Sequence, residues 1–207
     1  MSRSLVITVG ALVAASFASW AASSNAAGNS KVAIFAGGCF WCVEADFDRV
    51  PGVISTTSGY IGGKADTATY KTVSAGSTGH YEAVRIVYDP GKVTYDRLLH
   101  VFWHSVDPTD AGGQFCDRGT SYKSGVFIAN EAQRKIALAS KQKAETSLGK
   151  KIVTPIVKAE PFYEAEGYHQ NYYVRNPFRY SIYRYGCGRD KRIKSLWGSQ
   201  AHAGIKH

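Results

Sequence analysis

Two cysteines three positions apart follow a pair of glycines in GGCFWCVEADF, residues 37–47. The start of a helix has unpaired backbone N–H groups, and these groups and the helix dipole favour an anion. Such a setting lowers a thiol pKa and makes the reactive thiolate available at neutral pH. Cys39 is therefore a candidate nucleophile, and Phe40 and Trp41 are a candidate surface for a small uncharged group. A buried core cysteine among core aromatic residues is the alternative.

A carboxylate in YEAVRIVY, residues 81–88, is the second candidate. Alternation along a strand places Glu82 on the same face as Val84 and Ile86. Because an ionised carboxylate on an apolar face is unfavourable, we expect a raised pKa and a proton still bound at neutral pH. The alternative is a carboxylate near the strand's start that reaches solvent. A thiolate and a carboxylic acid together suit a reaction in which sulfur attacks and an oxygen leaves with protons.

Other residue types give weaker signals. Tyr70 and Tyr122 are expected in loops, and Asp117 in a turn, where each is an ordinary surface residue as readily as a functional one. His100 and His104 share a helix face, but no third ligand accompanies them, so a zinc pair is disfavoured.

The four cysteines do not have the spacing of a four-cysteine zinc site. Cys39 and Cys42 are suitably spaced, but Cys116 and Cys187 do not form a matching second pair. Two structural disulfides are conceivable in an oxidising compartment. A domain of this size does not need them, however, and cysteines three apart on a helix make a poor structural bridge.

The elements that position these residues follow a split βαβ order. Strand 31–36 precedes a helix from residue 39 to about 50, and extended residues 53–57 and strand 81–88 follow. A helix capped by Thr94, strand 124–129 and a helix from Asn130 to about 147 come next, with Gly149 closing the last. Strand 152–159 and a helix over 164–174 complete the pattern. We therefore predict a two-layer, ferredoxin-like α+β sandwich with long loops and an irregular C-terminal tail.

The first 26 residues have the pattern of a secretory signal peptide. Arg3 is followed by an apolar run over residues 5–18 and by Ser24-Asn25-Ala26, which resembles a cleavage site. An uncleaved anchor is the alternative, although the run is short for a membrane span. No cysteine lies near the cleavage site, which argues against a lipoprotein. We expect an exported protein, periplasmic or secreted, in which residues 27–207 form one catalytic domain with no stable membrane insertion.

The chain has 207 residues and a formal net charge of +9. For an exported protein, nucleic acid is an improbable partner, so we interpret the basic cluster after residue 188 as a solvated tail. Methionine is absent after the initiator.

Six segments closely resemble the peptide-methionine (S)-S-oxide reductase family. The resemblance covers about residues 31–188 in unbroken order. It implies a ferredoxin-like fold, reduction of methionine S-sulfoxide, free or in proteins, and no metal or organic cofactor. It also implies regeneration by an external thioredoxin-like reductant, and we expect a monomer. The segments are GGCFWCVE, PGVISTTSGYIGG, GHYEAVRIVYDP, LLHVFWHSVDPTD, DRGTSYKSGVF and PFYEAEGYHQNYYVRNP.

The resemblance assigns roles by motif. The nucleophile falls on Cys39 and the acid on Glu82, which the residues themselves already indicate. The remaining roles rest on resemblance alone: Phe40 and Trp41 for the methyl pocket, Tyr70 and Tyr122 for the phenols at the sulfoxide oxygen, and Asp117 for substrate positioning.

The thiol that resolves the sulfenic acid of Cys39 stays open between two residues. Cys187, in YGCGRD, is narrowly preferred because a mobile tail would carry it to Cys39. Cys42 lies one helical turn from Cys39 and needs no loop movement. Cys116 is expected to be a passive thiol or a relay. Cys42 and Cys116 are departures from the commonest family pattern.

Two other classes of protein compete with a reductase of sulfoxides. One is a secreted thiol–disulfide oxidoreductase that uses Cys39 and Cys42 on protein disulfides. The other is a non-enzymatic metal-binding or structural module. The absence of methionine favours the sulfoxide reductase, because such an enzyme then carries no internal substrate for oxidants.

Overall fold

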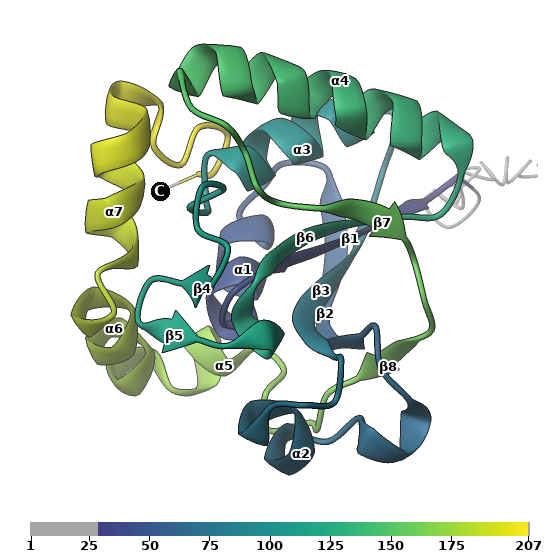
Figure 1. Cartoon of the computed structure of the whole chain (residues 1–207), viewed down its shortest axis with the longest axis vertical. Coiled ribbons are helices and arrows are strands. Elements are labelled where there is room, and N and C mark those ends of the chain that lie inside the picture. The colour runs from purple at the N-terminus through teal and green to yellow at the C-terminus, as the bar shows by residue number, and fades with distance from the viewer. Residues whose placement is uncertain (1–28, 207) are drawn as a thin grey trace, which may run out of the picture.

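The computed structural model describes residues 29–206, so the predicted signal peptide lies outside the described residues. Within this range the strands form a six-stranded sheet, ordered β7-β6-β1-β3-β2-β8, and a two-stranded sheet, β4-β5 (Figure 1). The strands are β1 (Lys31–Gly37), β2 (Val53–Ile61), β3 (Tyr81–Tyr88), β4 (Gly113–Gln114), β5 (Asp117–Arg118), β6 (Ser124–Ile128), β7 (Ile156–Lys158) and β8 (Phe162–Glu164). The helices are α1 (Phe40–Phe47), α2 (Tyr70–Ala75), α3 (Tyr95–Trp103), α4 (Glu131–Leu148), α5 (Tyr172–Arg175), α6 (Pro177–Gly186) and α7 (Arg189–Trp197), with short 3₁₀ turns at Ala65–Thr67, Thr120–Tyr122 and Gly198–Gln200.

The four central strands have the arrangement that a split βαβ chain produces. Strand β1 pairs antiparallel with both β3 and β6, and β3 pairs antiparallel with β2. Helix α1 connects β1 to β2, and α3 lies between β3 and β6 along the chain. Strand β8 extends the sheet beyond β2, and β7 adds a parallel strand beside β6. The predicted α+β fold of ferredoxin-like type is confirmed.

The main core lies between this sheet and α1 and α3. On β3, Val84, Ile86 and Tyr88 are buried in the main core, whereas Ala83 belongs to a small cluster on the opposite face of the sheet. Alternation along the strand therefore works as predicted. Burial of one large apolar side chain stabilises a fold by about 1.5–3 kcal/mol, so these positions fix the register of β3.

The helix boundaries follow the predicted caps. The Thr94 hydroxyl accepts a hydrogen bond of 3.1 Å from the Arg97 amide at the start of α3. The Asn130 side chain does the same for the Gln133 amide at 2.9 Å, and Gly149 ends α4 in a left-handed conformation with φ of 64°. None of the helices in residues 29–206 combines the length and apolar character that a bilayer span requires.

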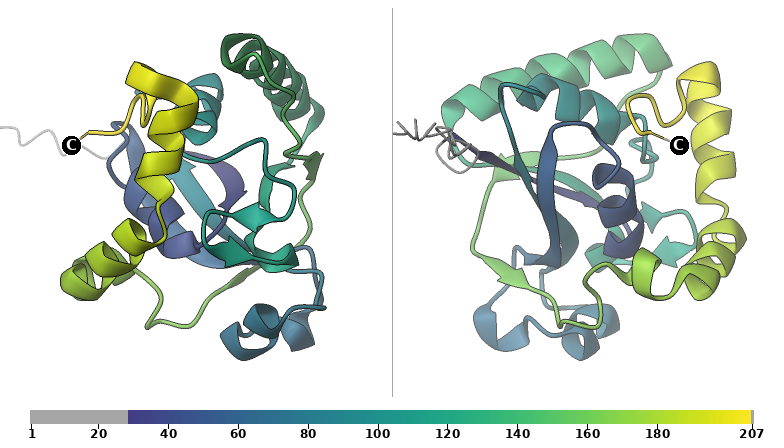
Figure 2. Two further views of the ribbon diagram at one scale, coloured as in Figure 1. Left: turned by 60° about the vertical axis from the view of Figure 1, so that its left-hand side comes forward. Right: turned by 180° about the vertical axis from the view of Figure 1, so that it is seen from behind.

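Two predictions for the last third of the chain are wrong. Residues 164–174 are not one helix, because β8 ends at Glu164 and α5 begins only at Tyr172. The tail is not irregular either, since α6 and α7 pack beside α1 at one end of the sheet (Figure 2). Nor is it wholly solvated, because Arg189 is 2% exposed. The basic residues after 188 include a buried one that interacts with the strand leading to Cys39.

Candidate active site

Cys39 lies at the junction between β1 and α1. Gly38 has φ of 80°, and a Cβ atom built on it would lie 2.6 Å from the Gln114 side chain, so only glycine fits this position. The chain turns sharply there and begins α1 with Cys39 as its N-cap residue. The Cys39 side chain is buried, with an exposed fraction of 7%. Cys39 lines a small cavity.

That cavity has a volume of about 50 Å³ and collects every residue predicted to bind or react with substrate. Helix α1 and its cap provide the thiol and the aromatic pair, and β3 provides the carboxylic acid. The predicted loop and turn positions of the others are wrong, because Tyr70 is the first residue of α2, Asp117 lies in β5 and Tyr122 ends a 3₁₀ turn. The structure adds one residue, Tyr183, that the sequence analysis missed. The lining residues are Cys39, Phe40, Trp41, Tyr70, Glu82, Asp117, Tyr122 and Tyr183.

Glu82 is a buried acid that keeps its proton at neutral pH. Its side chain is 2% exposed, and the Phe40 amide donates a hydrogen bond of 3.0 Å to Glu82 Oε2. Burial raises the pKa of Glu82 to about 8, although the Phe40 hydrogen bond opposes the shift. The prediction that Glu82 shares the apolar face of Val84 and Ile86 is confirmed, and the solvent-exposed alternative is wrong.

The resting thiol of Cys39 differs from the prediction. Burial raises its pKa well above the ordinary value, and the Cys42 thiol and the Glu82 charge act in the same direction. The Phe40 amide, at the first residue of α1, already donates a hydrogen bond to Glu82, so it is not free to stabilise a thiolate at Cys39. The expected low pKa is therefore wrong for this state. Among these groups, only the Tyr183 hydroxyl lowers the pKa of Cys39 and so favours the thiolate.

The phenols of the cavity are neutral hydrogen-bonding groups. Burial raises the pKa of Tyr70 and of Tyr122, and the Glu82 charge adds to both shifts. Tyr70 is fixed by its backbone, because its amide donates a hydrogen bond of 2.8 Å to Glu166 Oε1. Both residues can therefore donate to an oxygen atom bound in the cavity.

A second layer of aromatic residues supports the apolar wall. The Trp41 indole donates a hydrogen bond of 3.0 Å to His169 Nδ1 and stacks on Tyr172 at a centroid distance of 3.7 Å. The Phe40 ring packs against His169 at 4.9 Å. His169 and Tyr172 come from the segment wrongly predicted as one helix. Their only signal in the sequence is the motif PFYEAEGYHQNYY.

The four cysteines form two pairs of different kinds. Cys39 and Cys42 are free and buried, and the Cys42 amide donates a hydrogen bond of 3.1 Å to the Cys39 carbonyl, so the two lie within one turn of α1. Cys116 and Cys187 form a disulfide across a separation of 71 residues. In this state Cys187 is not free to react with Cys39, and Cys116 is not a passive thiol. These two cysteines also belong, with Asp117, to a group of three metal-ligating side chains in the described part of the chain, but their sulfurs are bonded to each other.

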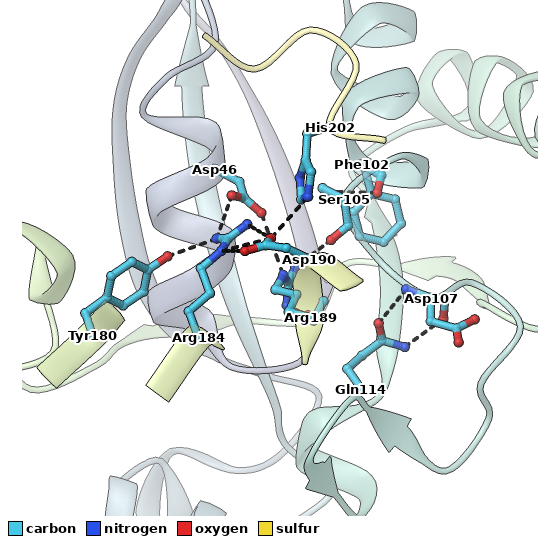
Figure 3. A network of polar contacts seen from close by, with 11 residues as sticks. Asp46, Phe102, Ser105, Asp107, Gln114, Tyr180, Arg184, Arg189, Asp190 and His202 are labelled. Carbon is cyan, nitrogen blue, oxygen red and sulfur yellow. Dashed lines mark hydrogen bonds and ion pairs between the residues drawn. The ribbon is translucent and has the colours of Figure 1, made fainter. Parts of the chain in front are cut away.

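An ion-pair network that is buried at Asp46 and exposed at Asp190 holds α6 against α1 (Figure 3). Arg184 Nη1 lies 2.8 Å from Asp46 Oδ1 on α1, and Arg184 Nη2 lies 2.7 Å from Asp190 Oδ1. His202 Nε2 lies 3.1 Å from the same Asp190 oxygen. A cavity of about 440 Å³ adjoins this network, larger than that at Cys39. It contains no cysteine, and Asp46, Arg184 and Asp190 are paired with one another, so we place the chemistry in the smaller cavity.

Arg189 anchors the end of β1 that leads to Cys39. Its guanidinium donates hydrogen bonds of 2.9 Å to the Gly37 carbonyl and 2.7 Å to the Ser105 carbonyl. Gly37 lies two residues before Cys39, so this buried cation fixes the backbone on which the thiol is mounted.

A cysteine that attacks and a neighbouring acid that supplies a proton are the working parts of thiol-dependent enzymes. The family described as "Peptide methionine sulfoxide reductase" matches residues 31–201. The chain is 51% identical over 181 residues to peptide methionine sulfoxide reductase MsrA 2 of Rhizobium meliloti, covering 87% of this chain and 90% of the relative. It is 51% identical over 172 residues to MsrA of Bacillus subtilis, covering 82% and 97%.

A solved structure agrees with these sequence relatives. Reduced Mxr1 from Saccharomyces cerevisiae superposes with a TM-score of 0.68 at 32% identity, covering 72% of this chain and 87% of that one. The chain belongs to the peptide methionine sulfoxide reductase family.

Proposed function

We propose that this protein reduces methionine S-sulfoxide, free or within proteins, to methionine. The observation that carries the proposal is the cavity in which the Cys39 thiol and the protonated Glu82 carboxyl face the same small space. The family to which the chain belongs supports the same reaction.

The reaction begins when the Cys39 sulfur, as a thiolate, attacks the sulfoxide sulfur. The sulfur–oxygen bond of the substrate breaks, Glu82 transfers its proton to the departing oxygen, and Tyr70 and Tyr122 donate hydrogen bonds to that oxygen. The oxygen leaves as hydroxide, and Cys39 is joined to the substrate by a sulfur–sulfur bond. The hydroxide then adds to the Cys39 sulfur and the sulfur–sulfur bond breaks, so methionine leaves as the reduced product and Cys39 is oxidised to a sulfenic acid.

The shape of the cavity explains selectivity for one hand of the sulfoxide. The substrate methyl group rests against the apolar wall of Phe40 and Trp41, while the oxygen faces Glu82 and the phenols. Exchanging oxygen and methyl at the same sulfur would place a polar atom on the aromatic wall and leave buried donors unpaired. Unpaired buried polar groups are costly, so the R epimer is rejected.

Cys42 is the resolving thiol that this geometry supports best. It lies within one helical turn of Cys39, so condensation with the sulfenic acid forms the Cys39–Cys42 disulfide and releases water without moving the backbone far. Cys187, which the sequence narrowly favours, takes this role only after its bond to Cys116 has opened.

An external thioredoxin-like dithiol then reduces the disulfide by exchange, and the reaction uses no organic cofactor. Residues 1–26 are proposed to direct export to the periplasm or the medium, and the Cys116–Cys187 disulfide is consistent with an oxidising compartment.

Incubation of the protein with each epimer of a blocked methionine sulfoxide and a thiol reductant tests the proposal. Consumption of the S epimer alone supports it. Reduction of insulin disulfides without sulfoxide turnover would instead identify a secreted thiol–disulfide oxidoreductase that uses Cys39 and Cys42.

A further inference from the structure

In the structure, both Glu82 and Cys39 hold a proton at neutral pH, although the proposed reaction needs an acid at Glu82 and a thiolate at Cys39. Glu82 keeps its proton at neutral pH, which suits its role, but burial also keeps the proton on Cys39, which does not. A thiol is a much weaker nucleophile than a thiolate. The Cys39 proton therefore needs an acceptor other than Glu82.

The structure contains a path of polar side chains that leads away from the Cys39 sulfur. Tyr183, on α6, lines the small cavity with Cys39, and its hydroxyl donates a hydrogen bond to Asp117 Oδ2 on β5. All three side chains line the same cavity. A hydroxyl accepts and donates at once, so Tyr183 can receive a proton from sulfur while it gives its own to the carboxylate.

Asp117 is the suitable end of this path. Aspartate has the lowest ordinary pKa of the residue types that line the cavity. Burial raises the pKa of Asp117, but the hydrogen bond from Tyr183 and the charge of Arg189 favour the carboxylate. Tyr183 does not remain ionised as a phenolate, because burial raises its pKa far above the usual range.

We propose that Tyr183 is a further catalytic residue, which passes the proton of the Cys39 thiol to the Asp117 carboxylate as the sulfur attacks. The S–H bond of Cys39 breaks, its proton binds the Tyr183 oxygen, and the original Tyr183 proton moves to Asp117 Oδ2. Nothing is oxidised or reduced in this step. With the proton that Glu82 gives to the oxygen, the total charge of the cavity is conserved. The inference rests on the proposed function, since it supplies the thiolate for that reaction.

Two tethers hold the path in place. Cys116 precedes Asp117, and Cys187 follows Tyr183 by one helical turn, so their disulfide joins the two segments that meet in the hydrogen bond. From the other side, Arg184, the neighbour of Tyr183, is paired with Asp46 on α1. Both segments are thus fixed to the helix that begins at Cys39.

Cys42 is the rival acceptor of the Cys39 proton. The Cys39 side chain and the charges of Arg189 and Arg184 lower its pKa. A direct transfer from Cys39 to Cys42 would need neither Tyr183 nor Asp117, so substitutions separate the two routes.

The test measures two rates across a range of pH in protein whose Cys116–Cys187 disulfide is intact. The first is methionine formation in a single turnover, and the second is alkylation of Cys39 by iodoacetamide, mapped by mass spectrometry. The variants are Tyr183→Phe, Asp117→Asn and the double substitution. Tyr185→Phe is the matched control, because it removes a hydroxyl from the same helix at a side chain that is 89% exposed.

We expect Tyr183→Phe to slow methionine formation by about 100-fold at neutral pH. The deficit in Cys39 alkylation should shrink in alkaline buffer, where hydroxide removes the proton directly. Asp117→Asn should behave alike, and the double variant should be no slower than the slower single variant, because both residues serve one path. Tyr185→Phe should match the parent.

Three results would overturn the inference. The rate of Cys39 alkylation in Tyr183→Phe could be reduced equally at every pH, or its pH dependence could equal that of the parent. The pH dependence of alkylation could also shift in Cys42→Ser but not in Tyr183→Phe. Melting temperatures of the variants identify a folding defect. A parent protein that forms no methionine would reject the proposed function, whereas the alkylation rates test the proton path without any substrate.

Discussion

The Phe40 amide donates a hydrogen bond of 3.0 Å to Glu82 Oε2, and this contact fixes the acid against the first turn of the helix that begins at the nucleophile. The Glu82 carboxyl group and the Cys39 thiol thereby line the same small cavity. Removing the acidic proton should therefore affect chemistry more than folding.

Glu82→Gln should slow methionine formation by about 100-fold or more, because the amide has no acidic proton to give. The same substitution should change the pH dependence of stability. The pKa of Glu82 is raised from 4.5 to about 8, so the folded parent loses stability as the pH rises through that interval. The glutamine variant should be more stable than the parent in alkaline buffer, on the order of a few kcal/mol, as measured by urea unfolding.

Glu44→Gln is the control for that experiment. Glu44 is also a buried carboxyl group on α1, and burial raises its pKa to about 7, but it lies outside the Cys39 cavity. The variant should alter the pH dependence of unfolding and leave turnover near that of the parent. Equal loss of activity in both glutamine variants would mean that Glu82 acts only through stability.

Cys39→Ser should abolish methionine formation, because a serine hydroxyl at this site has no route to an anion comparable to a thiolate. The measurement is product formed per protein molecule in a single turnover. Substantial product from this variant would remove Cys39 from the mechanism.

Cys42→Ser should still form one equivalent of methionine but fail to cycle with a thioredoxin-like reductant. Cys187→Ser should continue to cycle, since its thiol is bonded to Cys116 and not to Cys39. Steady-state assays and disulfide mapping by mass spectrometry distinguish the two. If Cys187→Ser fails to cycle and Cys42→Ser continues to cycle, Cys187 is the resolving residue.

Arg184→Ala should destabilise the fold by about 3 kcal/mol, because the buried Asp46 carboxylate loses its nearest cation and keeps only Arg189, whose Nε lies 3.7 Å away. It should also slow the reaction by loosening Tyr183. Arg179→Ala, an exposed arginine on the same helix, is the matched control and should change neither property. Similar melting temperatures for the two variants would show that the network does not stabilise α6.

Local rules explain what the sequence made predictable. The caps at Thr94 and Asn130 depend on neighbouring residues alone, and the burial of Glu82 follows from alternation along one strand. Each is decided within a few residues, so a single sequence suffices.

The errors come from contacts between distant segments. The Cys116–Cys187 disulfide spans 71 residues, and its formation depends on how α6 folds back toward β5. Arg189 is part of a basic cluster in the sequence but is buried because two backbone carbonyls accept its hydrogen bonds. The pKa of Cys39 has a related explanation: the helix start favours a thiolate, but burial outweighs that effect and raises the pKa.

Exposure differs between the two cysteine pairs, and this difference affects how the protein should be handled at the bench. Cys116 is open to solvent, whereas both members of the catalytic pair are buried. A small reagent such as dithiothreitol therefore meets the bond at Cys116 before it reaches the catalytic sulfurs. Activities recorded in an excess of such a reagent describe a protein whose sixth helix has lost its covalent anchor, and a protein donor that spares this bond should give the faster enzyme.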